Sequence, residues 1–210
     1  MNISIGLLKK LPKVELHCHL DGSLNPGTII DLAEKQKVAL PTTNVDELKN
    51  ILSIGDKRVS LEEYLEKFKI TLSILQTPES LERTAFELIQ EVAKENVRYI
   101  EIRYSPILHT EKGMTPEESV EAVLKGLKAG EEEFGVMSGI IICGIRNISP
   151  KISLKLAKLT LSYKHKGVVG FDLAGAEENF PAKKHKEAFY LIQNNNINAT
   201  IHAGEAFGPS

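Results

Sequence analysis

The sequence has few of the features that mark secreted, membrane-embedded or disulfide-stabilised proteins. It contains no tryptophan and two cysteines, Cys18 and Cys143. Two cysteines cannot build a disulfide framework, so a reducing, cytoplasmic location is expected. No apolar run approaches the roughly 18 residues of a membrane span, and the first residues lack the pattern of a cleavable signal peptide. We therefore predict no association with a membrane.

An excess of positive charge is also absent. The 210 residues include 26 Lys and Arg against 28 Asp and Glu, which gives a formal net charge of -2. Proteins dedicated to nucleic-acid binding are normally basic, so no nucleic-acid partner is expected. No linker rich in proline, glycine or serine divides the chain, which is 42% hydrophobic and 26% charged. This composition predicts a single globular domain over residues 1–210.

The sequence does contain short apolar segments that alternate with longer amphipathic ones. We expect strands at residues 14–20, 98–105, 139–145, 168–173 and 199–202. Between them, a polar capping residue precedes proline at four helix starts, namely Asn25-Pro26, Thr77-Pro78, Thr115-Pro116 and Ser149-Pro150. Repeated alternation of strand and helix predicts right-handed βαβ units and an α/β fold.

The spacing of these strands indicates the size of the whole fold. Five βα units in 210 residues give about 42 residues per unit, so eight units would need roughly 340 residues, within the range of (β/α)8 barrels. We therefore predict a TIM-type barrel of which this chain contains only about the first five units. An open arc of five strands would expose a sheet edge and part of the hydrophobic core.

The most specific local pattern is LHCHLDG at residues 16–22. Side chains alternate along a strand, so His17, His19 and Asp21 are expected on one face. Two imidazoles at the carboxyl end of a strand can bind one metal ion. The alternative is a pair of half-buried histidines without a ligand, but the Asp and Gly that follow them favour a metal site.

A second pattern, TIHAGE at residues 200–205, ends the last predicted strand. His202 would lie at the same end of the sheet, and Gly204 permits a turn that brings Glu205 over it. A third histidine with a nearby carboxylate indicates metal-assisted hydrolysis, in which the metal acidifies water and the carboxylate transfers protons. A core histidine followed by a glutamate that begins a helix is the alternative from these residues alone.

Two further polar sets lie on the predicted strands. Glu101 and Arg103 share one face of the second strand, where an internal ion pair between them is expected because inward charges are costly unless paired. The second set is Asp172, near the end of the fourth strand, in the segment that continues to Glu177. Gly175 follows this strand. Its lack of a side chain would let backbone N–H groups approach a ligand closely.

Four segments together resemble the adenosine deaminase family and occur in the family's order. They are KVELHCHLDGS at 13–23, EIRYSP at 101–106, GFDLAGAE at 170–177 and HAGE at 202–205. The resemblance implies a (β/α)8 barrel with one catalytic zinc ion per subunit. It also implies that the zinc ligands are His17, His19 and His202.

The same resemblance implies roles around a purine nucleoside. Glu205 matches the carboxyl group that protonates purine N1, and Gly175 matches the backbone donor to the purine ring. His19 and Asp21 resemble the contacts to the ribose 5′-hydroxyl side. The implied reaction converts adenosine and 2′-deoxyadenosine to inosine products and ammonia, as part of purine salvage. Asp at position 21 favours the adenosine branch, because relatives that act on free adenine often carry Glu there.

Family members supply a further catalytic histidine and an aspartate zinc ligand from later strands, and no residue after Ser210 is present to match them. We therefore expect the 210-residue chain alone to be inactive or poorly active. It would need a C-terminal segment supplied in cis or in trans. Two alternative functions remain: a related deaminase of adenine or a modified adenosine, and a truncated, non-catalytic protein that binds zinc or a nucleoside.

Overall fold

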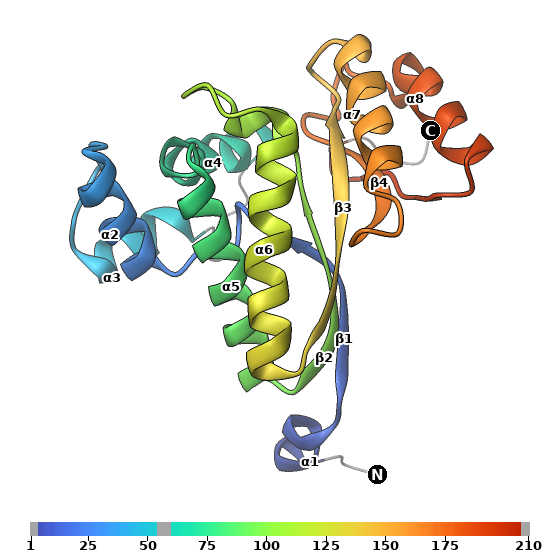
Figure 1. The fold of residues 1–210 in the computed structure, drawn as a ribbon. Helices are drawn as coiled ribbons and strands as arrows, with labels where there is room; N and C mark the ends of the chain where they lie inside the picture. Colours follow the sequence, from blue (N-terminus) through green and yellow to red (C-terminus); the bar gives the residue numbers. More distant parts are fainter. Residues whose placement is uncertain (1–3, 54–59, 207–210) are drawn as a thin grey trace.

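The computed structural model describes residues 4–53 and 60–206, which form a curved parallel sheet with helices on its outer side (Figure 1). Its strands are β1 (Lys13–His19), β2 (Val97–Tyr104), β3 (Met137–Ile145), β4 (Val168–Ala174) and β5 (Asn198–Ala199). Its helices are α1 (Ile5–Lys10), α2 (Pro26–Gln36), α3 (Val45–Leu52), α4 (Leu61–Ile74), α5 (Pro78–Lys94), α6 (Pro116–Phe134), α7 (Pro150–Ser162) and α8 (Lys186–Asn194), with short 3-10 turns η1 (Pro106–His109) and η2 (Ala182–His185).

The sheet has the strand order of consecutive βα units. Each strand pairs in parallel with the next one along the chain, in the order β1-β2-β3-β4-β5. This order confirms the predicted α/β architecture and is that of the first five units of a (β/α)8 barrel. Apolar side chains of the central strands, among them Ile100, Ile140 and Phe171, are fully buried.

The last predicted strand is shorter than the sequence pattern indicates. We expected it at residues 199–202, but β5 is confined to Asn198–Ala199. The chain nevertheless stays beside β4, because Thr200 N–H donates to Phe171 C=O and His202 N–H donates to Leu173 C=O, each at 3.0 Å. These two hydrogen bonds keep the predicted segment at the edge of the sheet beyond the end of β5.

The helix starts predicted from sequence are confirmed. Asn25, Thr77, Thr115 and Ser149 each accept a backbone N–H at a helix start, and each is followed by proline at the first helical position. The side chain therefore satisfies a donor that the helix cannot, and proline loses no hydrogen bond there. These caps therefore define the first residues of four helices, α2, α5, α6 and α7.

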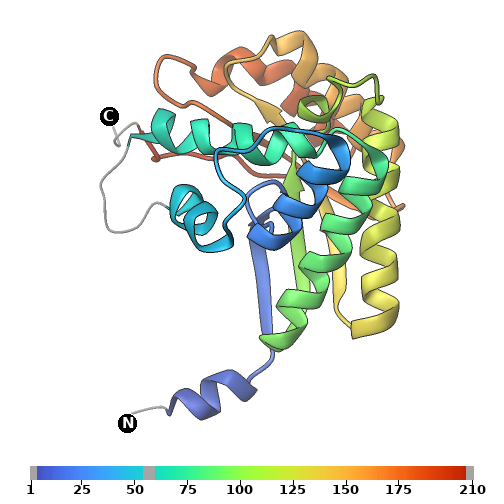
Figure 2. The same cartoon turned by 90° about the vertical axis from the view of Figure 1, so that its left-hand side faces the viewer.

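One segment between β1 and β2 departs from the simple unit length. The chain forms α2, α3 and α4 before α5 returns along the sheet, and these three helices gather at the carboxyl end of the strands (Figure 2). The short helix α1 lies at the opposite end, beyond the start of β1 (Figure 1). Helices α2 to α4 therefore bring side chains to the end of the sheet that holds the predicted site.

In the part of the chain that the structure describes, both outer edges of the sheet are open. β1 and β5 each pair with one neighbour, and Val14 and Leu16 on β1 are 61% and 53% exposed. This agrees with the expectation of an exposed edge and a partly uncovered core. Among residues 4–53 and 60–206, no helix is both long enough and apolar enough to cross a bilayer.

Helices α5 and α6 pack side by side at close range, and two glycines permit this approach. A Cβ at Gly126 would collide with the backbone carbonyl of Glu82, and a Cβ at Gly130 would lie 2.7 Å from Cβ of Ile89. By contrast, a Cβ at Gly6 in α1 would have no heavy atom of residues 4–53 or 60–206 within 4 Å.

This difference gives a stability prediction. Gly126→Ala should lower the free energy of unfolding by about 1–3 kcal/mol, because two helix backbones must separate to admit the methyl group. Gly6→Ala is the matched control and should leave stability unchanged or slightly raised. Denaturant unfolding of both variants measures the effect, and an unchanged midpoint for Gly126→Ala would contradict this account of the packing.

Candidate active site

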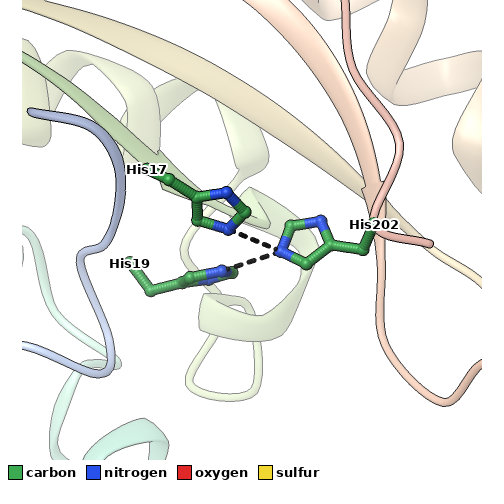
Figure 3. A group of neighbouring side chains, drawn as sticks. All are labelled: His17, His19 and His202. Atoms are coloured by element: carbon green, nitrogen blue, oxygen red, sulfur yellow. Dashed lines mark hydrogen bonds between the residues drawn. The ribbon is translucent and has the colours of Figure 1, made fainter. Parts of the chain in front are cut away.

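Three histidines from two ends of the sequence meet at the carboxyl end of the sheet. Nε2 of His202 lies 2.9 Å from Nε2 of His17 and 3.0 Å from Nε2 of His19 (Figure 3). Their potential ligand atoms all lie within 4.8 Å of one another. His17 and His19 belong to β1, whereas His202 follows β5, so the curvature of the sheet brings them together.

The three nitrogens fit a shared metal ion. Two nitrogens bound to one tetrahedral zinc ion at 2.0–2.1 Å are separated by about 3.3 Å, close to the separations found here. Within the described residues, this is the group of histidine, cysteine and carboxylate side chains whose atoms converge in this way. Three histidine ligands leave a further coordination position for water, as in catalytic zinc sites.

Electrostatics favour the neutral imidazoles that metal binding requires. Burial, with the neighbouring His202 and His17, lowers the pKa of His19 to about 4. Burial and the positive charge of Arg103 also lower the pKa of His17. Neutral rings offer a lone pair to a cation, so these shifts favour ligation near neutral pH.

A buried carboxylate stands behind the third histidine. Oδ2 of Asp172 lies 2.8 Å from Nδ1 of His202, although the ring N–H is not aligned as a hydrogen bond. Burial opposes ionisation of Asp172, but its contacts with His202 and Arg103 outweigh burial and hold its pKa well below the usual range. A carboxylate behind a ligating imidazole orients the ring and raises its basicity.

Arg103 forms an ion pair with Asp172, so the predicted ion pair between Glu101 and Arg103 was wrong. Arg103 pairs with Asp172 at 3.1 Å rather than with Glu101, and it donates to Leu16 C=O at 2.8 Å. Glu101 instead accepts a hydrogen bond from the Tyr99 hydroxyl. Asp172 is the stronger partner because both of its oxygens lie inside the sheet, where an unpaired guanidinium would be costly.

Asp21 lies in the turn after β1 rather than within the strand, since β1 ends at His19. It is 5% exposed, Oδ1 has no hydrogen-bond partner among the residues that the structure describes, and burial raises the pKa of Asp21 to about 7. The side chain lines a cavity of about 280 Å³ together with Tyr64 and Phe68 of α4. Phe68 also contacts the ring of His19 edge-on, so the cavity adjoins the histidine cluster.

The remaining predicted residues lie at the same end of the sheet. Gly175 follows β4 with a φ of 92°, a conformation that side chains rarely adopt. Glu205 follows His202 by three residues and is exposed. Burial raises the pKa of Tyr64, and the negative charges of Asp21 and Glu205 raise it further.

Comparison with known proteins identifies the family. The sequence model described as adenosine deaminase matches residues 12–210. The chain belongs to the adenosine deaminase family. An adenosine deaminase from Clostridium botulinum (strain 657) is 47% identical over 199 residues, which cover 94% of this chain and 60% of the relative. The chain thus spans less than two thirds of that relative's length.

Solved structures of related deaminases share the fold of this family member. An adenine deaminase from Arthrobacter aurescens is 28% identical with a TM-score of 0.81, covering 91% of this chain and 57% of the other. An N6-mAMP deaminase from Arabidopsis is 26% identical with a TM-score of 0.83, covering 98% and 62%. These matches confirm the barrel class and the presence of its N-terminal part.

The sequence patterns missed the contacts of several supporting residues of this adenosine deaminase family member. Asp172 and Glu177 lie inside the segment 170–177, but nothing in their spacing indicated contacts with the chain around His202. Arg146 lies in no recognised motif. Charged residues near the carboxyl end of a buried strand, or just after it, are the signal that could have found these contacts, because the carboxyl ends of parallel strands share one edge.

Proposed function

We propose that the protein carrying this chain catalyses zinc-dependent hydrolytic deamination of adenosine and 2′-deoxyadenosine, releasing ammonia. Membership of the family makes it a hydrolase acting on C–N bonds, and the relative from Clostridium botulinum is an adenosine deaminase. The observation that carries the proposal is the convergence of His17, His19 and His202 on one point. We place this reaction in purine salvage. A reducing cytoplasm would keep Cys18 and Cys143 unpaired, as they are in the structure.

His17, His19 and His202 would hold the zinc ion, one per subunit. When bound, zinc supplies a water molecule acidified enough to act as a nucleophile near neutral pH. Asp172, which is paired with Arg103, lies next to Nδ1 of the His202 ring. The overall reaction consumes one water molecule and replaces the amino group at purine C6 with oxygen.

The other predicted residues would bind and polarise the purine nucleoside. Glu205 would donate a proton to purine N1, which makes C6 more electrophilic. The backbone N–H of Gly175 would donate to the purine ring. His19 and Asp21 would lie on the ribose 5′-hydroxyl side, where the unpartnered Oδ1 of Asp21 offers a buried acceptor.

Substrate assays test this proposal against the two related activities. The assays should follow inosine from adenosine, 2′-deoxyinosine from 2′-deoxyadenosine, hypoxanthine from adenine, and IMP from AMP and N6-methyl-AMP. We expect adenosine to exceed adenine by about 100-fold or more in kcat/KM, because adenine leaves the buried Asp21 without a partner. Activity should disappear on dialysis against a chelator and return with zinc. Preference for adenine or N6-methyl-AMP would replace the adenosine assignment.

We further infer that this chain acts together with a C-terminal segment supplied in cis or in trans. The exposed Val14 and Leu16 on β1 and the open edge at β5 support a completed barrel. The 210-residue chain alone is then expected to bind zinc weakly and to turn over poorly. A zinc titration of that chain that shows tight one-to-one binding would contradict this inference and favour a zinc-binding role for the chain alone.

A further inference from the structure

A carboxylate to which the sequence patterns assigned no role contacts the segment that carries His202 and Glu205. Glu177 follows β4, and its side chain is 10% exposed. Oε1 accepts the backbone N–H of Gly204 at 3.0 Å. Oε2 accepts the N–H groups of Glu205 at 2.8 Å and Ala206 at 2.9 Å. One carboxylate therefore binds three successive backbone donors.

Three successive N–H groups that point to one place form a concave anion-binding arrangement. Hydrogen bonds from such donors to a carboxylate are stronger than those between neutral groups. Residues 204–206 are exposed and lie outside helices and strands. The position of this stretch consequently depends on Glu177 rather than on a helix or a sheet ladder.

Arg146 holds the same segment from its other side. This residue follows β3, its side chain is 4% exposed, and Nη2 donates to the carbonyl of His202. Nη1 donates to Phe180 C=O at 3.1 Å, and Nη2 lies 3.7 Å from Oε1 of Glu177. The guanidinium thus links the backbone of a zinc-ligand residue to the carboxylate that binds the following three amides.

Arg146 is itself fixed by a buried pair. Nε2 of His185 lies 3.2 Å from the carbonyl of Arg146, and Nδ1 of His185 lies 2.8 Å from Oγ of Ser153. His185 and Ser153 are buried, on η2 and α7 respectively. A chain of hydrogen bonds therefore runs from α7 and η2 through Arg146 to His202, which follows β5.

We propose that Glu177 is a positioning residue for the active site, and that Glu177 and Arg146 act as a clamp on residues 202–206. The clamp fixes His202 through its carbonyl and Glu205 through its own N–H, so the third ligand and the proton donor keep a constant relation. The catalytic part of this inference rests on the proposed function. The structural part, the restraint of residues 204–206, does not.

The primary test uses the intact protein that carries this sequence, in its metal-free and zinc-loaded forms. Amide hydrogen exchange of Gly204, Glu205 and Ala206 should be slow in the unmodified protein, although these residues are exposed. Glu177→Gln should remove that protection, since an amide offers one acceptor oxygen and turns an NH2 group toward N–H donors. Glu178→Gln is the matched control, because it removes the same charge one residue later at an exposed position.

Zinc titration and steady-state kinetics of the same variants measure how loss of the Glu177 contacts affects zinc affinity and turnover. Glu177→Gln should weaken zinc binding and lower kcat by about 10- to 100-fold, the usual effect of removing support behind a metal site. KM for adenosine should change by less than about threefold, because the substrate contacts from β1 remain. Glu178→Gln should match the unmodified protein in every measurement.

The outcomes separate the clamp from the proposed reaction. Fast exchange at residues 204–206 in the unmodified protein would overturn the clamp, even if Glu177→Gln failed to fold. Equal effects of Glu178→Gln and Glu177→Gln would overturn it as well. If no purine is deaminated but the three amides are protected and Glu177→Gln weakens zinc binding, the proposed function fails while the restraint by Glu177 stands.

Discussion

His202→Asn is expected to eliminate measurable zinc-dependent deamination in the intact protein. Nε2 of His202 lies at the centre of the cluster, within 3.0 Å of both other imidazoles. An asparagine side chain is shorter and offers no ring nitrogen. Zinc affinity should therefore fall by more than the roughly 10- to 100-fold that loss of a supporting residue costs. Isothermal titration with zinc and an inosine-formation assay measure the two effects.

His165→Asn is the matched control for this prediction. His165 lies in the turn after α7 with a φ of 64°, a conformation that asparagine tolerates well. The same substitution at this distant position should leave zinc affinity and turnover unchanged. Retention of tight zinc binding by His202→Asn would refute the three-histidine centre.

Asp172→Asn is expected to have the second largest effect, on both stability and zinc binding. The carboxylate is fully buried, pairs with Arg103 at 3.1 Å and accepts the Thr200 hydroxyl at 2.9 Å. Removal of its charge leaves the buried guanidinium of Arg103 uncompensated, which typically costs 3–5 kcal/mol. The His202 ring also loses its oriented carboxylate, so zinc affinity should fall by about 10- to 100-fold.

A surface ion pair provides the control for charge removal. Glu91 pairs with Lys94 at 2.6 Å, but both side chains are more than half exposed. Glu91→Gln should leave the unfolding midpoint and zinc affinity nearly unchanged, since exposed pairs contribute little. If Asp172→Asn unfolds at the same denaturant concentration as Glu91→Gln, the buried pair does not stabilise this fold.

The histidine cluster illustrates why local patterns predict some side-chain arrangements well. His17 and His19 lie two residues apart on one strand, so period-two alternation alone brings them to one face. His202 was expected beside them because the carboxyl ends of parallel strands share one edge. The positions of all three histidines could be predicted because side-chain alternation and the shared edge of parallel strand ends are the same in every parallel sheet.

The partner of Arg103 illustrates where such patterns fail. Glu101 is two residues away and on the same face, so the sequence favoured it, yet the ion pair joins β2 to β4. Whether Arg103 pairs with Glu101 or with Asp172 depends on how β2 and β4 are aligned along the sheet and on which carboxylate is buried away from water. Neither quantity has a signature in the order of residues along one strand.

The cavity beside Asp21 depended on a similar long-range arrangement. Tyr64 and Phe68 come from α4, a helix whose capping box at Ser60 and Glu63 is legible in the sequence. The sequence does not show where α4 lies relative to the sheet, because that position depends on contacts of α2 with α3 and α4, and on the ion pair between Asp31 of α2 and Arg83 of α5. The helix could be predicted, but not the ligand cavity that it helps to form.

By itself the sequence determined the alternation of strands and helices, the capped helix starts, the family and the three zinc-ligand candidates. These follow from local rules of backbone geometry, capping and side-chain alternation. Only the tertiary structure decided that Asp172 supports His202 and that Glu177 and Arg146 hold the segment after β5. Those contacts join residues 25–70 positions apart, and their energies depend on burial and aligned donors, which exist only once the sheet has curved and its strand ends have met.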